Sequence, residues 1–279
     1  MKSPVEVELM RLRVNKELRK SNLLNEFGFR MSSTTSHTSR TIMLAELEIL
    51  FTQTKNKKSS LQNYQLLIVD YNCLHKSSFI SRELTLRDLK SLYGLDDSIT
   101  LFRVLKLLWG KDPQSLPILA FSCAYCRDSL LRASQSFVLK YPERALLARQ
   151  DLEKFLSQTF PNRFSSKTLC SVSQNINSSW TQAGYLKGRV KKIRTRINPS
   201  VVSVVYVLLL GFLSGYRGTA LFETEFTELL DSSKETLIML AEDASRQGLI
   251  YMKRLGNVID IDFSKLLLKE EMETLYDQD

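Results

Sequence analysis

A helix followed by a short β-ribbon is predicted by residues 164–197, FSSKTLCSVSQNINSSWTQAGYLKGRVKKIRTRI. One face of the predicted helix carries apolar residues at helical spacing, namely Leu169, Val172, Ile176 and Trp180. After Gly184 the pattern changes to the alternation of a hairpin, with its turn at residues 187–189. This segment therefore joins a helix to two short strands.

The same order of elements recurs about 65 residues later in the chain. Residues 232–247, SSKETLIMLAEDASRQ, predict an amphipathic helix, and residues 248–263, GLIYMKRLGNVIDIDF, predict a hairpin that turns at residues 255–257. Both copies open with Ser-Ser-Lys and carry a glycine, Gly184 or Gly248, between helix and ribbon. Helix, helix, ribbon is the order of a winged helix, a variant of the helix-turn-helix.

The chain before residue 164 is predicted to be helical. Ser39 is a plausible N-cap for a helix over IMLAELEILF, after a loose Ser/Thr-rich segment at residues 30–40. Residues 94–97 divide two later helices, and Pro113 and Pro117 precede a long helix to Leu139 and another over 144–158. The expected fold is mainly α, with a helical N-terminal domain and two tandem winged-helix-like units with short β-ribbons. The expected divisions are a charged helix and linker at 1–40, a helical domain at 41–112, a basic winged unit at 113–197, a second winged unit at 198–269 and an acidic tail at 270–279.

The hydrophobic segments of the sequence indicate where in the cell the protein is expected. The N-terminus mixes Lys, Arg and Glu without the apolar core of a signal peptide, so a cytoplasmic protein is expected. The apolar run at residues 201–216 contains two serines and two glycines and is shorter than the roughly 20 apolar residues that span a bilayer. We expect it to form a buried helix, with no membrane partner.

The sequence offers little support for enzymatic chemistry or for a metal. Cys123 and Cys126 form a CxxC within an apolar stretch, LPILAFSCAYCRDSLL, and no second pair stands at zinc-site spacing, so we expect buried thiols. His37 and His75 are the two histidines, and neither has an evident Ser, Cys or metal-ligating partner in the sequence. No phosphate-binding GxxxxGK[ST] motif is present. We therefore expect a non-enzymatic protein without metal, cofactor or small-molecule substrate.

The net charge of +9 is concentrated in one window. No Asp or Glu occurs from residue 154 to residue 222, a stretch that holds ten Lys and Arg residues, so the rest of the chain is about neutral. A concentrated positive surface attracts polyanions, because each neutralised phosphate releases condensed counterions. Double-stranded DNA is the partner we expect, and structured RNA is a second possibility that ribbon charge alone does not exclude.

The predicted DNA-binding residues lie on the outer face of the first unit's helix and on its ribbon. The helix would offer uncharged donors and acceptors beside one lysine, and the ribbon would offer six cations for phosphate. The full set is Lys167, Ser171, Gln174, Asn175, Ser178, Lys187, Arg189, Lys191, Lys192, Arg194 and Arg196. A solvated basic hairpin without a ligand is the alternative, and the absence of acids counts against it.

The second unit differs from the first in charge. Its helix and ribbon carry acids, Glu235, Glu242, Asp243, Asp260 and Asp262, that would oppose phosphate. We expect a structural or protein-binding role there, and an assembly subunit without any nucleic-acid role is the alternative for the whole chain. For the acidic segment 270–279, a frayed helix end is favoured over a tail that competes with DNA.

Three stretches resemble the BrxA family of accessory proteins from BREX-type bacterial phage-defence systems. These are SSTTSHTSRTIMLAELEILF at 32–51, DYNCLHKSSFISRELTLRDLKSLYGL at 70–95 and FSSKTLCSVSQNINSSWTQAGYL at 164–186. The resemblance implies a helical protein with winged-helix features, DNA binding, a role in antiviral defence and partners among other defence-system proteins. The chain departs from that pattern in its charged N-terminal extension and in its second winged unit. The resemblance carries no catalytic motif, so it assigns no role to an individual residue.

Overall fold

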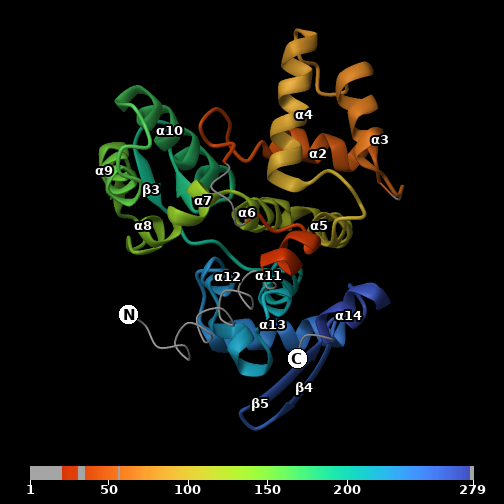
Figure 1. Cartoon of the computed structure of the whole chain (residues 1–279). Helices are drawn as coiled ribbons and strands as arrows, with labels where there is room; N and C mark the ends of the chain where they lie inside the picture. Colours follow the sequence, from red (N-terminus) through yellow and green to blue (C-terminus); the bar gives the residue numbers. More distant parts are fainter. Residues whose placement is uncertain (1–20, 31–34, 56, 277–279) are drawn as a thin grey trace, which may run out of the picture.

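The computed structural model describes residues 21–30, 35–55 and 57–276. The protein is mainly helical, with two small antiparallel sheets. Figure 1 shows helices α2 to α4 in one lobe, α9 and α10 with the first sheet in a second lobe, and α13 with β4 and β5 in a third. Helices α5, α6 and α11 lie where these lobes meet.

The N-terminal lobe contains α2 (Leu44–Gln53), α3 (Leu61–Gln65), the π-helical turn η1 (Leu66–Asp70) and α4 (Phe79–Tyr93), and α5 (Thr100–Lys111) follows it. The predicted break after α4 is confirmed: Gly94 has φ +96, and a Cβ there would lie 2.8 Å from the Cδ1 atom of Ile99. The predicted N-cap is wrong. Helix α2 begins after Met43, which is in the left-handed region and supplies no side-chain cap.

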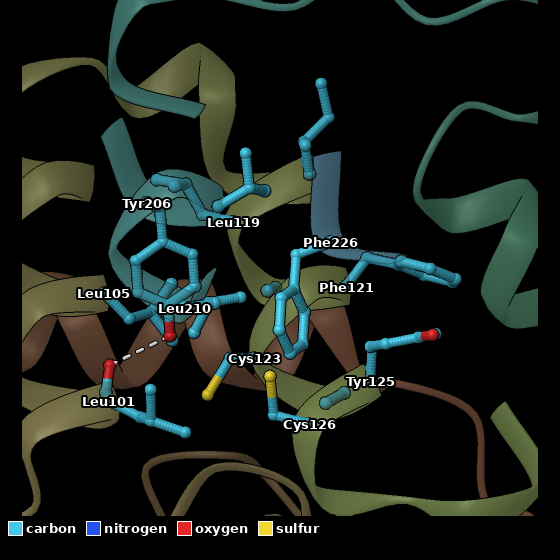
Figure 2. Close-up of a cluster of buried hydrophobic side chains, with 14 of the residues drawn as sticks. Leu101, Leu105, Leu119, Phe121, Cys123, Tyr125, Cys126, Tyr206, Leu210 and Phe226 are labelled. Atoms are coloured by element: carbon cyan, nitrogen blue, oxygen red, sulfur yellow. Dashed lines mark hydrogen bonds between the residues drawn. The ribbon is translucent and has the colours of Figure 1, made fainter. Parts of the chain in front are cut away.

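Two apolar helices, α6 (Leu116–Arg127) and α11 (Val201–Leu213), form the centre of the core. They pack on each other and on α5, and the hydroxyl of Tyr206 donates to the Leu101 carbonyl at 3.0 Å (Figure 2). Cys123 and Cys126 are fully buried here, as predicted, and burial raises the pKa of Cys123 to about 11. Among the described residues, no helix combines the length and the hydropathy needed to cross a bilayer.

The long helix predicted to reach Leu139 is interrupted. After the 3-10 turn η2 (Pro113–Ser115), α6 ends at Arg127, and α7 (Ser129–Ala133) and α8 (Gln135–Leu139) follow as separate helices. Asp128 causes the break, because it has extended backbone angles and its carboxylate caps the backbone N–H groups of Leu130 and Leu131.

The first sheet belongs to residues 146–194. Its strands are β1 (Leu146–Leu147), β2 (Leu186–Lys187) and β3 (Lys192–Arg194), in the order β1-β3-β2, and α9 (Arg149–Thr159) and α10 (Ser166–Gln182) lie between β1 and β2 in the chain. The hairpin is confirmed, with Lys187 opposite Ile193, but its loop is residues 188–191 and not the predicted 187–189. Strand β1 occupies residues predicted to open a helix, and it is stabilised by pairing with β3, more than 40 residues away in the chain.

The C-terminal lobe contains η3 (Gly218–Glu223), α12 (Glu225–Glu228), α13 (Lys234–Arg246), the hairpin β4 (Tyr251–Leu255) and β5 (Val258–Asp262), and α14 (Lys269–Tyr276). The predicted hairpin is confirmed, and Gly256 has the positive φ that its two-residue turn requires. The segment predicted to be an acidic tail includes α14. This helix is anchored to α5, because the Glu271 carboxylate receives the Arg103 guanidinium at 2.6 Å.

Candidate nucleic-acid interface

The ribbon of the first sheet presents cations at its tip. Lys187, Arg189, Lys191 and the more distant Arg196 are exposed, and the structure records no ion pair for any of them within its described residues. The four-residue loop 188–191 joins the two strands. These four side chains are therefore exposed without a recorded charged partner, consistent with the absence of acids in this window of the sequence.

The loop geometry depends on Gly188 and Lys192. Gly188 has φ +99, and a Cβ at this position would overlap the carbonyl oxygen of Lys191. The Lys192 ammonium donates to the Gly188 carbonyl at 2.7 Å, and partial burial lowers the pKa of this lysine. Lys192 therefore closes the loop and is less available to a ligand than its neighbours.

The structure removes Arg194 from the predicted set of DNA-binding residues. Its side chain is only 2% exposed, and its guanidinium donates to the carboxylate of Asp231 at 2.7 Å. It also donates to the carbonyls of Tyr185 and Thr195. Arg194 thus joins the first sheet to the C-terminal lobe, and its position leaves no path to a phosphate. A run of alternating cations could not reveal this, because the carboxylate partner lies outside the acid-free window.

The predicted reading face of α10 is divided in two. Lys167 and Gln174 are exposed and Ser171 is partly exposed, so the N-terminal half of the face is open. In the C-terminal half, the Asn175 amide donates to the His37 carbonyl at 3.0 Å. Ser178 is also partly covered, 3.5 Å from the Gln182 amide. Asn175 is therefore committed to a tertiary contact that sequence did not indicate.

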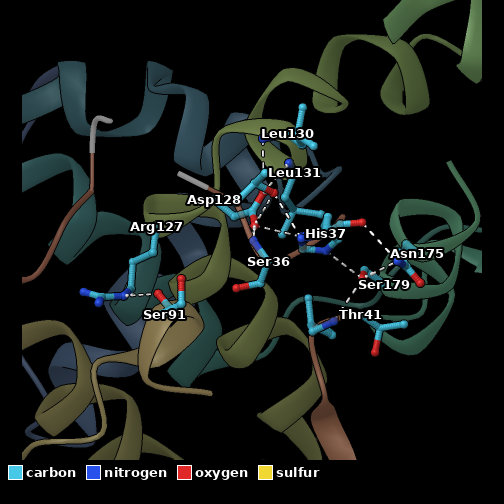
Figure 3. Close-up of polar contacts among 12 residues, drawn as sticks. Ser36, His37, Thr41, Ser91, Arg127, Asp128, Leu130, Leu131, Asn175 and Ser179 are labelled. Atoms are coloured by element: carbon cyan, nitrogen blue, oxygen red, sulfur yellow. Dashed lines mark hydrogen bonds and ion pairs between the residues drawn. The ribbon is translucent and has the colours of Figure 1, made fainter. Parts of the chain in front are cut away.

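The partner of that half of α10 is the segment 35–43, which we call the strap. Residues 35–40 of the strap fall in the segment predicted to be loose, yet Ser36 and His37 are buried, as is Ile42. Ser179 of α10 accepts the backbone N–H of Ile42 at 3.0 Å, and the Gln182 amide donates to the Thr41 hydroxyl at 3.0 Å. Figure 3 shows the strap between α10 and the start of α7. Residues 31–34 of the predicted linker lie outside the described residues.

A buried contact between His37 and Asp128 anchors the strap at its centre. The Nδ1 atom of His37 lies 2.9 Å from the Asp128 carboxylate, which also accepts from the Thr35 hydroxyl at 2.8 Å and from the Ser36 N–H at 2.7 Å. Burial by itself would raise the pKa of Asp128, but His37 and the donated hydrogen bonds outweigh it and hold this pKa well below its ordinary value. Asp128 therefore remains ionised while it caps α7.

The other imidazole nitrogen, Nε2, lies 2.9 Å from the Ser179 hydroxyl. The fold thus brings together Ser179, His37 and Asp128, a combination that sequence failed to reveal because the serine and the histidine are 142 residues apart. These three residue types can perform acyl transfer when the serine meets a substrate. Here Ser179 and His37 are 0% exposed, and the serine hydroxyl already contacts Ile42 and Asn175. We assign the cluster to holding the strap.

The second ribbon and α13 have balanced charge. Arg254 pairs with Glu242 at 3.0 Å, and Lys234 and Arg246 pair with Glu223 and Asp243. Lys253 stands opposite Asp260 in the hairpin register. The two ribbons therefore differ in charge as the sequence predicts. No group of three or more His, Cys, Asp or Glu side chains in the described ranges is placed to hold a metal ion.

Comparison of the chain with protein-family models and with curated proteins found no match.

Proposed function

We propose that residues 113–197 form a winged helix that binds double-stranded DNA, mainly through phosphate contacts. The order helix, strand, helix, helix, strand, strand, with the sheet order β1-β3-β2, supports this interpretation. The observation that carries the DNA proposal is the set of exposed, unpaired cations on the ribbon and at the start of α10. Duplex binding also agrees with what the resemblance to BrxA proteins implies.

Each cation has a defined task in this proposal. Lys187, Arg189, Lys191 and Arg196 contact phosphates from the ribbon, and Lys167 contacts one at the N-terminus of α10, where the helix dipole also favours an anion. Gln174 is exposed and can approach base edges, and Ser171, whose hydroxyl donates to the Lys167 carbonyl at 3.3 Å, can still accept a hydrogen bond there. Because the strap engages Asn175, we expect the protein to read few bases.

The salt dependence of binding tests the number of phosphate contacts. With five cations on phosphate, log K for a 20-base-pair duplex should fall with log salt at a slope of about −4.5. Fluorescence anisotropy between about 50 and 200 mM salt measures this slope. A slope shallower than about −2 would contradict the proposed contact set.

Charge reversal on the ribbon tests its location. We expect Lys187→Glu, Arg189→Glu and Lys191→Glu together to weaken duplex binding by more than about 100-fold, because three attractions become repulsions. The matched control carries Lys253→Glu, Lys265→Glu and Lys269→Glu on the C-terminal lobe, which change the net charge equally. The control should lose no more than about fivefold through long-range effects. Equal losses in the two variants would place the binding surface elsewhere.

The same anisotropy assay tests whether structured RNA, the alternative ligand, binds better than DNA. A DNA duplex and an RNA duplex of the same sequence compete for the protein, and the proposal expects DNA to win because the deep, narrow major groove of RNA excludes α10. Preference for the RNA duplex would replace DNA by RNA as the ligand.

The C-terminal lobe supports a second proposal, a contact with a protein partner. At the tip of its ribbon, Leu255 and Val258 face each other across the hairpin, and both are largely exposed. An apolar pair on a charge-balanced ribbon suits a protein surface better than phosphate. Replacing Leu255 and Val258 by Ser should release a co-purifying partner that otherwise remains bound in about 1 M salt, where charge contacts are screened. Retention of that partner by the double variant would overturn this proposal.

A further inference from the structure

One apolar side chain occupies the tip of the cationic ribbon. Val190 is 88% exposed and stands between Arg189 and Lys191, in the loop that Gly188 and Lys192 hold in shape. Phosphate binding makes no use of an isopropyl group. A ligand that offers anionic groups beside sheltered apolar walls could contact both the cations and Val190.

Only the loop side chains need enter the minor groove of duplex DNA. This groove is about 6 Å wide, too narrow for a two-stranded ribbon with its side chains but open to single side chains, so the loop residues can enter it while the strands remain outside. Helix α10 and the ribbon belong to one lobe, with α10 packed on β2 (Figure 1). When α10 faces the major groove, the ribbon can therefore reach the neighbouring minor groove.

The polar chemistry of the tip selects among base pairs. Lys187, Arg189 and Lys191 offer hydrogen-bond donors, and no carboxylate occurs between residues 154 and 222 to accept one. In the minor groove, A·T pairs present only acceptors, whereas G·C pairs add the amino donor of guanine. Donors on the protein are thus matched by A·T and opposed by G·C. A·T tracts also narrow the groove and deepen its negative potential, which favours an inserted arginine.

We infer that Arg189 and Val190 enter the minor groove of A·T-rich DNA, with the arginine on the base acceptors and the valine against the sugar walls. This inference rests on the proposed function. It assigns to the ribbon a preference based on groove chemistry and shape, while the remaining cations hold phosphates of any sequence.

Three duplexes of equal length distinguish recognition in the minor groove from recognition in the major groove. One has an A·T centre, one a G·C centre, and in the third inosine replaces guanine at the centre. Inosine lacks the 2-amino group, so its pairs with cytosine resemble A·T in the minor groove and G·C in the major groove. We expect the A·T and inosine duplexes to bind alike, about fivefold or more tighter than G·C. Equal affinity for all three, or an inosine duplex that behaves like G·C, would overturn the inference.

Two variants assign the preference to the tip. Arg189→Lys keeps the charge and should reduce the A·T preference to less than about twofold while binding to the G·C duplex changes little. Val190→Ala removes two methyl groups without adding a hydrogen-bonding group and should also weaken binding to the A·T duplex selectively. A preference unchanged in both variants would place the discriminating contact outside the tip. Loss of the proposed function looks different, because then none of the three duplexes binds.

Discussion

Replacing Asp128 by Asn is expected to lower the free energy of unfolding by about 3–5 kcal/mol, because several buried donors lose the carboxylate that accepts from them. The carboxylate caps α7, receives the strap at Thr35 and Ser36, and faces His37. An amide would turn an N–H₂ group toward donors that are out of reach of water. Urea unfolding followed by circular dichroism measures the loss, and a change below about 1 kcal/mol would show that the strap contributes little.

The same variant should alter the pH dependence of stability. Because the folded pKa of Asp128 lies well below its ordinary value of about 3.9, the stability it contributes is complete above that value and is lost as the pH falls through the folded pKa. The difference between wild type and Asp128→Asn should therefore shrink as the pH falls from about 5 toward 2. A difference that grows over that range would contradict the assignment.

Asp112→Asn is the matched control for this prediction. Asp112 also caps a turn, accepting the N–H of Gln114 at 3.2 Å, but in the described structure it faces no buried imidazole. Since Asn is as good an N-cap as Asp, the cost should stay below about 1 kcal/mol. An equal loss of unfolding free energy in both variants would show that the effect comes from helix capping and not from the contact with His37.

The second large effect concerns Arg194. Replacing it by Met keeps the volume but leaves the Asp231 carboxylate and the Thr195 carbonyl without their donor, while the Tyr185 carbonyl keeps only the backbone N–H of Thr195. We expect the free energy of unfolding to fall by about 2–4 kcal/mol. Duplex affinity of the folded protein should change by less than about twofold, with an unchanged salt slope, because the side chain contacts no phosphate.

The opposite result is expected for Arg196→Met, a substitution two residues further along the chain than Arg194→Met. Its side chain is exposed, so stability should stay within about 0.5 kcal/mol of wild type. The salt slope should become shallower by about 0.9, the equivalent of one phosphate contact. If Arg194→Met, rather than Arg196→Met, changed the slope, the division between structural and ligand-binding cations would be reversed.

The strap connects the N-terminal lobe to the proposed DNA-binding helix. The hydroxyl of Tyr93 in α4 donates to the carbonyl of Ile42, whose own N–H is held by Ser179 of α10. The position of α10 therefore depends on contacts made by residues 35–43 as well as on its own apolar face. Variants that loosen the strap should affect DNA binding through this position, so affinity is best measured where the variant remains folded.

Local patterns predicted much of the fold. Period-3.6 spacing placed the buried face of α10 at Val172, Ile176 and Trp180, and glycine with alternating residues located both hairpins. These succeeded because the deciding interactions lie within a few residues of one another. Strand β1 and the break at Asp128 were missed, because each depends on groups that only the folded chain brings close.

By itself the sequence determined that the chain is mainly helical and that its positive charge is concentrated in the first ribbon, because helical periodicity and charge content are local properties. Only the tertiary structure decided which of those cations face solvent. In the folded chain Arg194 is buried and pairs with Asp231, and Lys192 donates to the loop carbonyl of Gly188. His37 of the strap contacts both Asp128 and Ser179. The physical reason is that burying a charge or a polar group requires a specific partner, and here those partners come from distant parts of the chain.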